Sequence, residues 1–375
     1  MDQRCNNQYE CPDKSDENDC MNLLIDKESY GKDSPPFTDG TNVKVNVSII
    51  ILTVDKIDLT SATFHAKIEL ILKWKDYRLT YVNLLQDGNI VGKDVKQEIW
   101  IPPLRFTNAP IGSIINDEDT TISIIKEGKY MLNDVTELHE ARIYKGSEND
   151  LMYSRIYAMK FECKYNLVLY PFDAQICTIN IDTPEFFDKY IDIYNESTRN
   201  LGSLKLEQFW ITNVELISSR KNSEVIGKIY LKRIPWFHIS TTYAPIVCLF
   251  IMVLGTLFID RSHFEATIMV ALTGMLVMQT LFQSISTSMP ATAYLKLLDY
   301  WLIFGLIMPF FVFSTLIYNE LLTQRKKQVT IGGPGTMYKK VDTTFIIYAR
   351  CVLFGITIAF NFIYGIIATT TYFSY

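Results

Sequence analysis

One stretch of the sequence carries polar side chains at a spacing that could guide ions through an apolar surrounding. No charged residue occurs from Ala266 to Met289, and Glu265 directly precedes this stretch. Steps of three or four residues place a carboxylate, hydroxyls and an amide on one helical face. A stripe that faces lipid would not hold these polar groups. The alternative is that the Ser and Thr side chains pack between helices. The face comprises Glu265, Met269, Thr273, Leu276, Thr280, Gln283 and Thr287.

Four apolar runs are long enough to hold that face across a bilayer. They cover roughly residues 236–259, 267–289, 297–322 and 343–372. A helix of about 20 residues crosses a hydrocarbon core of ~30 Å. We therefore expect a four-helix membrane domain over residues 236–375.

The positions of the charged residues predict how these runs are oriented in the membrane. The loop at 323–342 holds five Lys or Arg residues, and positive residues stay on the cytosolic side. We therefore expect a multi-pass plasma-membrane protein whose amino-terminal half is extracellular and whose short loop at 323–342 is cytosolic. Sequons at Asn46 and Asn195 agree with this orientation, because N-glycosylation occurs outside the cell.

The amino-terminal half is acidic. Residues 236–375 hold eight Lys or Arg and five Asp or Glu, so the totals of 36 and 41 leave 28 basic and 36 acidic residues before them. The resulting net charge of −8 argues against a nucleic acid as partner. It would favour cations in any vestibule that this half surrounds.

The same half has the sequence pattern of a β-sandwich. Residues 43–49 and 64–70 alternate between apolar and polar side chains, and further short segments separated by turn signals extend over 42–235. Many short strands over this length favour an antiparallel sandwich. Residues 21–41 contain two glycines and two prolines, and we expect them to form a linker.

Two cysteines enclose the most specific motif. Cys163 and Cys177 flank thirteen residues that include Tyr170-Pro171-Phe172-Asp173. A disulfide between them would restrain the unfolded chain by about 3 kcal/mol, and Pro171 could set a tight turn through a cis bond. An ordinary sandwich disulfide would fit the cysteines alone. The aromatic-Pro-aromatic-Asp sequence and the four apolar runs disfavour that alternative.

With these motifs, residues 42–375 resemble a Cys-loop receptor subunit. The segments 74–79 (Trp-Lys-Asp-Tyr-Arg-Leu) and 100–102 (Trp-Ile-Pro) resemble motifs of that family, although Pro103 replaces the usual Asp. The matches also include Asn108, Arg233 and Pro245. The resemblance implies an extracellular all-β antiparallel sandwich followed by a four-helix transmembrane bundle, with five subunits around a pore and a ligand bound at extracellular subunit interfaces.

The resemblance places the polar face on the channel axis, where five copies would form rings. A Glu265 ring would attract cations and a Leu276 ring could gate by dewetting. Anion-selective relatives usually carry a Pro-Ala insertion near Glu265, whereas this sequence has Glu-Ala-Thr. We therefore expect selectivity for cations. The alternatives are an anion-selective member of the family, or a non-conducting cell-surface receptor or partner subunit.

The resemblance also implies a gating interface between sandwich and helices. It would combine the cysteine loop, a turn at 54–58, the strand before the first span and the loop after the second span. Solvated charges or an ion pair that stabilises the fold are alternatives for each residue alone. The expected interface residues are Asp55, Tyr170, Pro171, Phe172, Asp173, Arg233, Pro290 and Tyr294.

The sequence defines the ligand site poorly. Positions matching the family's aromatic box hold Glu69, Thr107 and Pro184. Because a quaternary amine needs aromatic faces, we do not expect such a site in a homopentamer, although the chain could lend one face to a partner. Including nearby aromatic residues, the candidates are Glu69, Thr107, Phe186, Phe187 and Tyr230.

Residues 1–20 resemble the second half of a low-density-lipoprotein-receptor class A module, with Cys5, Cys11 and Cys20. Acidic residues of that family bind Ca²⁺, which prefers oxygen ligands. A disordered acidic remnant is the alternative. The resemblance assigns the Ca²⁺ ligands to Asn6, Glu10, Asp16 and Glu17.

The sequence contains neither a Gly-rich phosphate loop nor a His pair at metal-ligand spacing, so we do not expect an enzyme. No cofactor is expected beyond Ca²⁺ at residues 1–20. The expected partners are four further subunits, a small-molecule ligand, membrane lipid and permeant cations. The agonist, and the choice between homomeric and heteromeric assembly, stay open.

Overall fold

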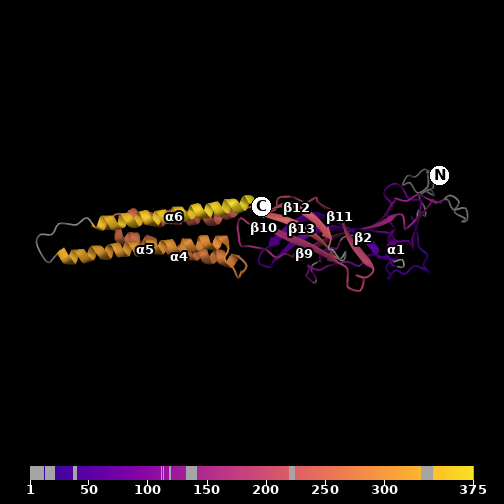
Figure 1. The fold of residues 1–375 in the computed structure, drawn as a ribbon, viewed down its shortest axis with the longest axis horizontal. Helices are drawn as coiled ribbons and strands as arrows, with labels where there is room; N and C mark the ends of the chain where they lie inside the picture. Colours follow the sequence, from indigo (N-terminus) through magenta and orange to yellow (C-terminus); the bar gives the residue numbers. More distant parts are fainter. Residues whose placement is uncertain are drawn as a thin grey trace.

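The computed structural model describes residue 12 and residues 22–36, 40–110, 112, 114–117, 120–131, 142–218, 224–330 and 341–374. Strands occupy one end of an elongated molecule and long helices the other (Figure 1). The end of the last helix returns to the junction between the two parts (Figure 1). The expected order of a β-sandwich followed by membrane-length helices is confirmed.

The described strands form three sheets. A six-stranded sheet has the order β11-β2-β3-β9-β6 with β7 also on β9, a four-stranded sheet has the order β12-β13-β10-β5, and a small sheet has the order β1-β4-β8. The strands are β1 (Leu23–Leu24), β2 (Val43–Asp58), β3 (Thr63–Trp74), β4 (Thr80–Val82), β5 (Arg105–Phe106), β6 (Ile114–Asp117), β7 (Thr121–Ile125), β8 (Ile143–Lys145), β9 (Asp150–Glu162), β10 (Ala174–Asp182), β11 (Ile191–Asn200), β12 (Phe209–Ser218) and β13 (Glu224–Arg233), with the short helix α1 (Lys93–Lys96) after β4.

One strand pair departs from the antiparallel expectation. β11 runs parallel to β2, whereas the other pairs of named strands are antiparallel. The chain leaves the four-stranded sheet after β10 and joins the edge of the six-stranded sheet as β11. A connection that changes sheets is not a hairpin, so it does not impose an antiparallel direction.

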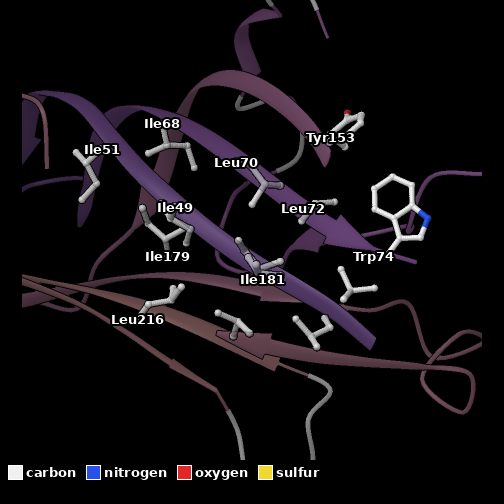
Figure 2. Packing of buried hydrophobic residues seen from close by; sticks show 14 of the residues in the cluster. Ile49, Ile51, Ile68, Leu70, Leu72, Trp74, Tyr153, Ile179, Ile181 and Leu216 are labelled. Atoms are coloured by element: carbon white, nitrogen blue, oxygen red, sulfur yellow. The ribbon is translucent and has the colours of Figure 1, made fainter. Parts of the chain in front are cut away.

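The core lies between the two large sheets. Every second residue of β3 from Phe64 to Trp74 is buried, as the alternation predicts. Figure 2 shows Ile49 and Ile68 of one sheet opposite Ile179 and Ile181 of the other. Each such fully buried side chain contributes about 1.5–3 kcal/mol relative to exposure.

The segment expected to be a linker lies against the sandwich instead. Strand β1 pairs with β4. The Tyr30 hydroxyl donates a hydrogen bond to the buried Asp76 carboxylate at 2.9 Å and accepts one from the Trp100 amide at 3.0 Å. The turn residues of the segment gave no sign of the two-residue strand or of the contacts of the half-buried Tyr30. Residues 22–36 are therefore part of the sandwich.

Four helical stretches have the length and hydropathy needed to cross a membrane. The first span combines α2 (Trp236–His238), the π-helical η2 (Ile239–Tyr243), α3 (Ala244–Gly255) and the 3-10 turn η3 (Thr256–Phe258). After a second 3-10 turn, η4 (Arg261–His263), come α4 (Phe264–Ser288), α5 (Leu297–Thr330) and α6 (Val341–Ser374). Because α5 and α6 extend beyond the apolar runs, the connection between them is shorter than the expected loop at 323–342.

Candidate functional site

The polar stripe of α4 lies on the exposed side of that helix. All seven stripe residues are exposed in the single chain, and the large apolar members Met269 and Leu276 are 61% and 66% exposed. The opposite side of α4 is buried at Thr267, Ala271 and Met278. The helix therefore has one face packed within its own subunit and one face left open.

Close packing fixes the orientation of α4. A Cβ atom added at Gly274 would lie 2.7 Å from a methyl group of Val253 on α3, and one added at Gly305 of α5 would lie 3.5 Å from the Met278 sulfur. The small residues let α3, α4 and α5 approach closely. Rotation of α4 that moved Leu276 off the open face would push its buried side chains out of this packing.

The hydroxyl groups of the stripe are bonded to their own helix. Thr273 donates to the Met269 carbonyl at 2.8 Å, Thr280 to the Val277 carbonyl at 2.8 Å and Thr287 to the Gln283 carbonyl at 3.0 Å. These bonds occupy the hydroxyl hydrogen and leave oxygen lone pairs on the open face. The three threonine hydroxyls of the stripe therefore already have hydrogen-bond acceptors, and their oxygen atoms still make the open face polar.

The cysteine loop closes as expected and reaches the helices. Cys163 and Cys177 form a disulfide, and the Tyr170–Pro171 peptide is cis. Leu167 and Tyr170, at the tip of the loop, are buried in one apolar cluster with residues of the membrane helices. Phe172 also packs on this cluster and lies 6.3 Å from Tyr243, between ring centroids. The loop tip therefore forms part of the packing of the membrane domain.

A buried ion pair lies beside that tip. Arg233 Nε is 2.6 Å and Nη2 is 3.0 Å from the two carboxylate oxygens of Asp173, with both side chains almost completely buried. The guanidinium carbon lies 4.7 Å and 4.3 Å from the ring centroids of Tyr170 and Phe209. Gln175 donates a further hydrogen bond to Asp173. Burial raises the pKa of the Tyr170 hydroxyl, and the nearby Arg233 charge opposes that rise.

The backbone of the cysteine loop caps helix α5. The Leu297 amide donates to the Val168 carbonyl at 2.7 Å, and the Leu298 amide donates to the Tyr170 carbonyl at 3.1 Å. The first amides of a helix lack partners within it, so the sandwich satisfies the start of a membrane helix. Displacement of the loop must either carry the start of α5 with it or break these bonds.

Tyr294, in the loop after α4, contacts the cysteine loop. Its hydroxyl oxygen accepts a hydrogen bond from the amide of the buried Leu167 at 3.0 Å. Tyr294→Phe is expected to lower stability by about 1–3 kcal/mol, because the Leu167 amide would stay buried without its acceptor. Thermal melting of the full chain measures the loss. Tyr300→Phe, a change at an exposed tyrosine of α5, serves as the control, and equal melting of the two variants would contradict the expected role.

The first expected contact turn needs a correction. Residues 54–58 belong to β2, whose pairing register shifts between Val54 and Lys56, and Asp55 at that irregularity is exposed. The turn follows four residues later, and its Leu59 packs against the membrane cluster. The turn lies at Leu59 because the strand continues through the irregularity instead of ending there, and a role of Asp55 in gating stays a prediction. Pro290, in the loop after α4, is half-buried.

Asp58 organises that turn. Its carboxylate accepts hydrogen bonds from the Thr60 amide and hydroxyl and from the Ser61 amide, and these bonds lower its pKa to about 2. A depressed pKa contributes stability above the unfolded-state value and loses it as pH falls through the folded-state value. Asp58→Asn is therefore expected to lessen the fall in melting temperature between about pH 4 and pH 2. An unchanged pH profile in Asp58→Asn would contradict this.

The ligand-site candidates are divided between the two large sheets. Glu69 on β3 accepts a hydrogen bond from Ser154 at 2.5 Å, whereas Tyr230 on β13 donates one to Glu215 at 3.0 Å. Thr107 follows β5 and is exposed. Phe186 is 77% exposed and Phe187 packs on the core. Because β3 and β13 belong to different sheets, a site using both Glu69 and Tyr230 would need two copies of the chain.

Two other groups of predicted residues have different outcomes. Asn46 on β2 is half-buried, and the exposed Asn195 on β11 donates to the Leu216 carbonyl at 3.0 Å, so glycosylation of either stays a prediction. No cluster of metal-ligating side chains occurs among the described residues. The expected Ca²⁺ ligands lie outside those residues, as do the cysteines near them: Asn6, Glu10, Asp16, Glu17, Cys5, Cys11 and Cys20.

The structure adds interface residues that the sequence analysis missed. His238 lies 3.0 Å from the Tyr170 hydroxyl, and Gln175 bridges Asp173 to the Asn166 backbone. Leu167 supplies both an apolar contact and the amide bonded to Tyr294. The position of Leu167 and Gln175 inside the cysteine loop was the available signal. His238 carried a weaker one as a polar residue at the start of an apolar run.

Comparison with known proteins places the chain in a family. Residues 17–239 match the neurotransmitter-gated ion-channel ligand binding domain. The chain is 23% identical over 316 residues to the human gamma-aminobutyric acid receptor subunit rho-3, covering 80% of this chain and 63% of that protein. It is 22% identical to human rho-1, covering 77% of this chain and 59% of that protein, and 22% identical to a Drosophila melanogaster beta-like subunit, covering 74% and 55%.

This chain therefore belongs to the neurotransmitter-gated ion-channel family, whose members are Cys-loop receptor subunits and not enzymes. Members are multi-pass plasma-membrane proteins with an extracellular amino-terminal ligand-binding domain, which confirms the expected location and orientation. The chain spans 55–63% of the length of the three relatives named above.

The relatives overturn the expected cation selectivity. Gamma-aminobutyric acid receptor rho subunits are anion-selective channels, and that finding contradicts cations as the permeant ions. The error arose from assigning Glu265 a single role. Glu265 lies in the first turn of α4, where a carboxylate also stabilises a helix by facing the positive end of its dipole. Its presence therefore does not identify a cation filter.

Proposed function

We propose that this chain is an anion-selective subunit of a pentameric ligand-gated channel, with the open face of α4 lining the pore. The observation that carries the proposal is that α4 has two different sides: Ala271 and Met278 are buried in the subunit, while every stripe residue is exposed. If five copies are arranged around an axis, all five open faces border the same water-filled pore. Leu276 would then form the apolar ring.

Anion selectivity is supported by the relatives and by the helix dipole at the start of α4. The positive end of that dipole would lie at the proposed inner mouth, where it would attract anions. Asp260 and Arg261 precede the helix and Glu265 lies in its first turn, so the formal side-chain charges there do not by themselves select anions.

The ligand proposal is an amino-acid-like molecule at the extracellular interface between two subunits. The named relatives are receptors for gamma-aminobutyric acid, which carries an ammonium group and a carboxylate. Glu69 on one sheet and the Tyr230–Glu215 pair on the other offer acceptors for an ammonium group. Because these groups are on different sheets, the ligand would contact both subunits. Gamma-aminobutyric acid is the first compound to apply.

Cysteine accessibility tests the pore assignment. In a chain whose Cys5, Cys11, Cys20, Cys248 and Cys351 are replaced by Ser, we expect Thr280→Cys to react with a charged, water-soluble thiol reagent and to lose current. Met278→Cys, two residues away but buried, is expected to stay unmodified. Equal modification at both positions would mean that the α4 face does not line an aqueous pore.

A further inference from the structure

An exposed patch of apolar and basic side chains lies on the outer side of the sandwich near its junction with the helices. Trp210 on β12 is 44% exposed, and Leu204 in the loop before it is 57% exposed. The Lys205 ammonium lies 5.6 Å from the centroid of the Trp210 ring. Trp210 is opposite Lys232 in the β12–β13 pairing. One surface therefore combines a tryptophan, a leucine and two lysines.

Contacts from two directions place this patch at the membrane boundary. The Ile234 amide donates to the Gln208 carbonyl at 2.8 Å, and the first span begins two residues later at Trp236. The Lys232 ammonium lies 4.4 Å from the ring centroid of Tyr372, which belongs to the last span. The end of α6 lies beside the sandwich in Figure 1. The loop before β12 is thus held at the level where both spans leave the bilayer.

The chemistry of the patch fits the headgroup layer. Trp and Tyr are enriched there because one part of each ring system is apolar and another is polar. Lysine side chains can lie along apolar surface while the ammonium reaches phosphate. Within the described part of the chain, neither Lys205 nor Lys232 forms an ion pair with a carboxylate. Glu207 is the acidic residue of the same loop, so the patch retains a positive charge.

We propose that this patch is a docking surface for phospholipid headgroups of the outer leaflet. The surface consists of Leu204, Lys205, Trp210, Lys232 and Tyr372. It bridges the extracellular strand β13 and the end of α6, so a bound lipid would join the strand that enters the membrane to the last helix. Four of the five residues of this surface belong to the extracellular domain, so the lipid contact would be made by that domain itself, whatever the permeant ion or the ligand.

Measuring how deep a nitroxide label lies in the bilayer tests the location of the patch. A nitroxide is attached at Leu204→Cys in a background in which Cys5, Cys11, Cys20, Cys248 and Cys351 are replaced by Ser, with the full chain in phosphatidylcholine vesicles containing phosphatidylglycerol. We expect oxygen to relax the label more than a water-soluble nickel complex does. The control is Ile217→Cys, also exposed on β12 but about 23 Å further along the strand from Trp210, which should be relaxed mainly by nickel. Equal nickel access at both positions, or exclusion of both agents by a neighbouring copy, would overturn the proposal.

Charge reversal tests the chemistry. Phosphatidylglycerol vesicles should raise the melting temperature of the wild type above its value in phosphatidylcholine alone, and Lys205→Glu with Lys232→Glu should abolish the increase. Each lysine is expected to contribute about fivefold in apparent affinity for the anionic lipid. Lys228→Glu, the same change on β13 further from the membrane, should retain the increase. Equal loss in Lys228→Glu, or an equal increase with inorganic phosphate alone, would contradict a lipid surface.

Discussion

Asp173→Asn is expected to destabilise the chain by about 3–5 kcal/mol, the largest loss that a single polar substitution should cause here. The Arg233 guanidinium would remain buried between two aromatic rings with its paired carboxylate removed. The amide keeps the shape of the carboxylate, so packing changes little and the uncompensated charge accounts for the loss. Thermal melting and surface expression of the full chain measure it.

The matched control is Asp182→Asn. Asp182 pairs with Arg105 at 3.1 Å, but half of the Arg105 side chain is exposed. Solvent screens such a pair, so this change should cost less than about 1 kcal/mol. Equal losses of stability in the two variants would show that burial does not increase the contribution of the Asp173–Arg233 pair. Replacing both members of the buried pair by apolar residues should cost less than Asp173→Asn alone.

Leu276→Thr is expected to open the channel without ligand. The Leu276 side chain is 66% exposed in the subunit, so it contributes little to the packing of α4. In the proposed assembly it forms the apolar constriction, and a hydroxyl at each of five positions would let water remain there. If the change removes about 1.4 kcal/mol of preference for the closed state, the open fraction rises tenfold. Current without ligand measures it.

Met278→Thr is the control that separates an effect on the pore from an effect on helix packing. This residue is on the same helix but is 2% exposed and packs towards α5. We expect lower expression and stability with no gain in current without ligand. A gain in Met278→Thr equal to that of Leu276→Thr would contradict the assignment of Leu276 to the gate.

Regular periodicity made much of the structure predictable. The stripe of α4 follows from the 3.6-residue period, and all seven of its members are on the exposed side. The burial of alternate residues of β3 follows from the two-residue period of strands. The family resemblance places both Asp173 and Arg233 at the membrane face, where they form the buried ion pair.

Features that depend on irregular backbone were not predictable. The capping of α5 uses carbonyl groups of Val168 and Tyr170, which leave no trace in side-chain type. β2 continues through the register shift near Asp55, so the turn that contacts the membrane cluster lies at Leu59. Glu265 could serve either a helix start or a cation ring, and one sequence does not separate these roles. Its misassignment led to the wrong ion.

The reversal potential of the ligand-evoked current distinguishes an anion pore from a cation pore. With most external Cl⁻ replaced by a large impermeant anion, we expect the reversal potential to shift to more positive values. Replacing Na⁺ by a large cation should leave it unchanged, and both results should hold for Glu265→Gln. A reversal potential that follows Na⁺ and ignores Cl⁻ would contradict the assignment of this chain as an anion-conducting subunit.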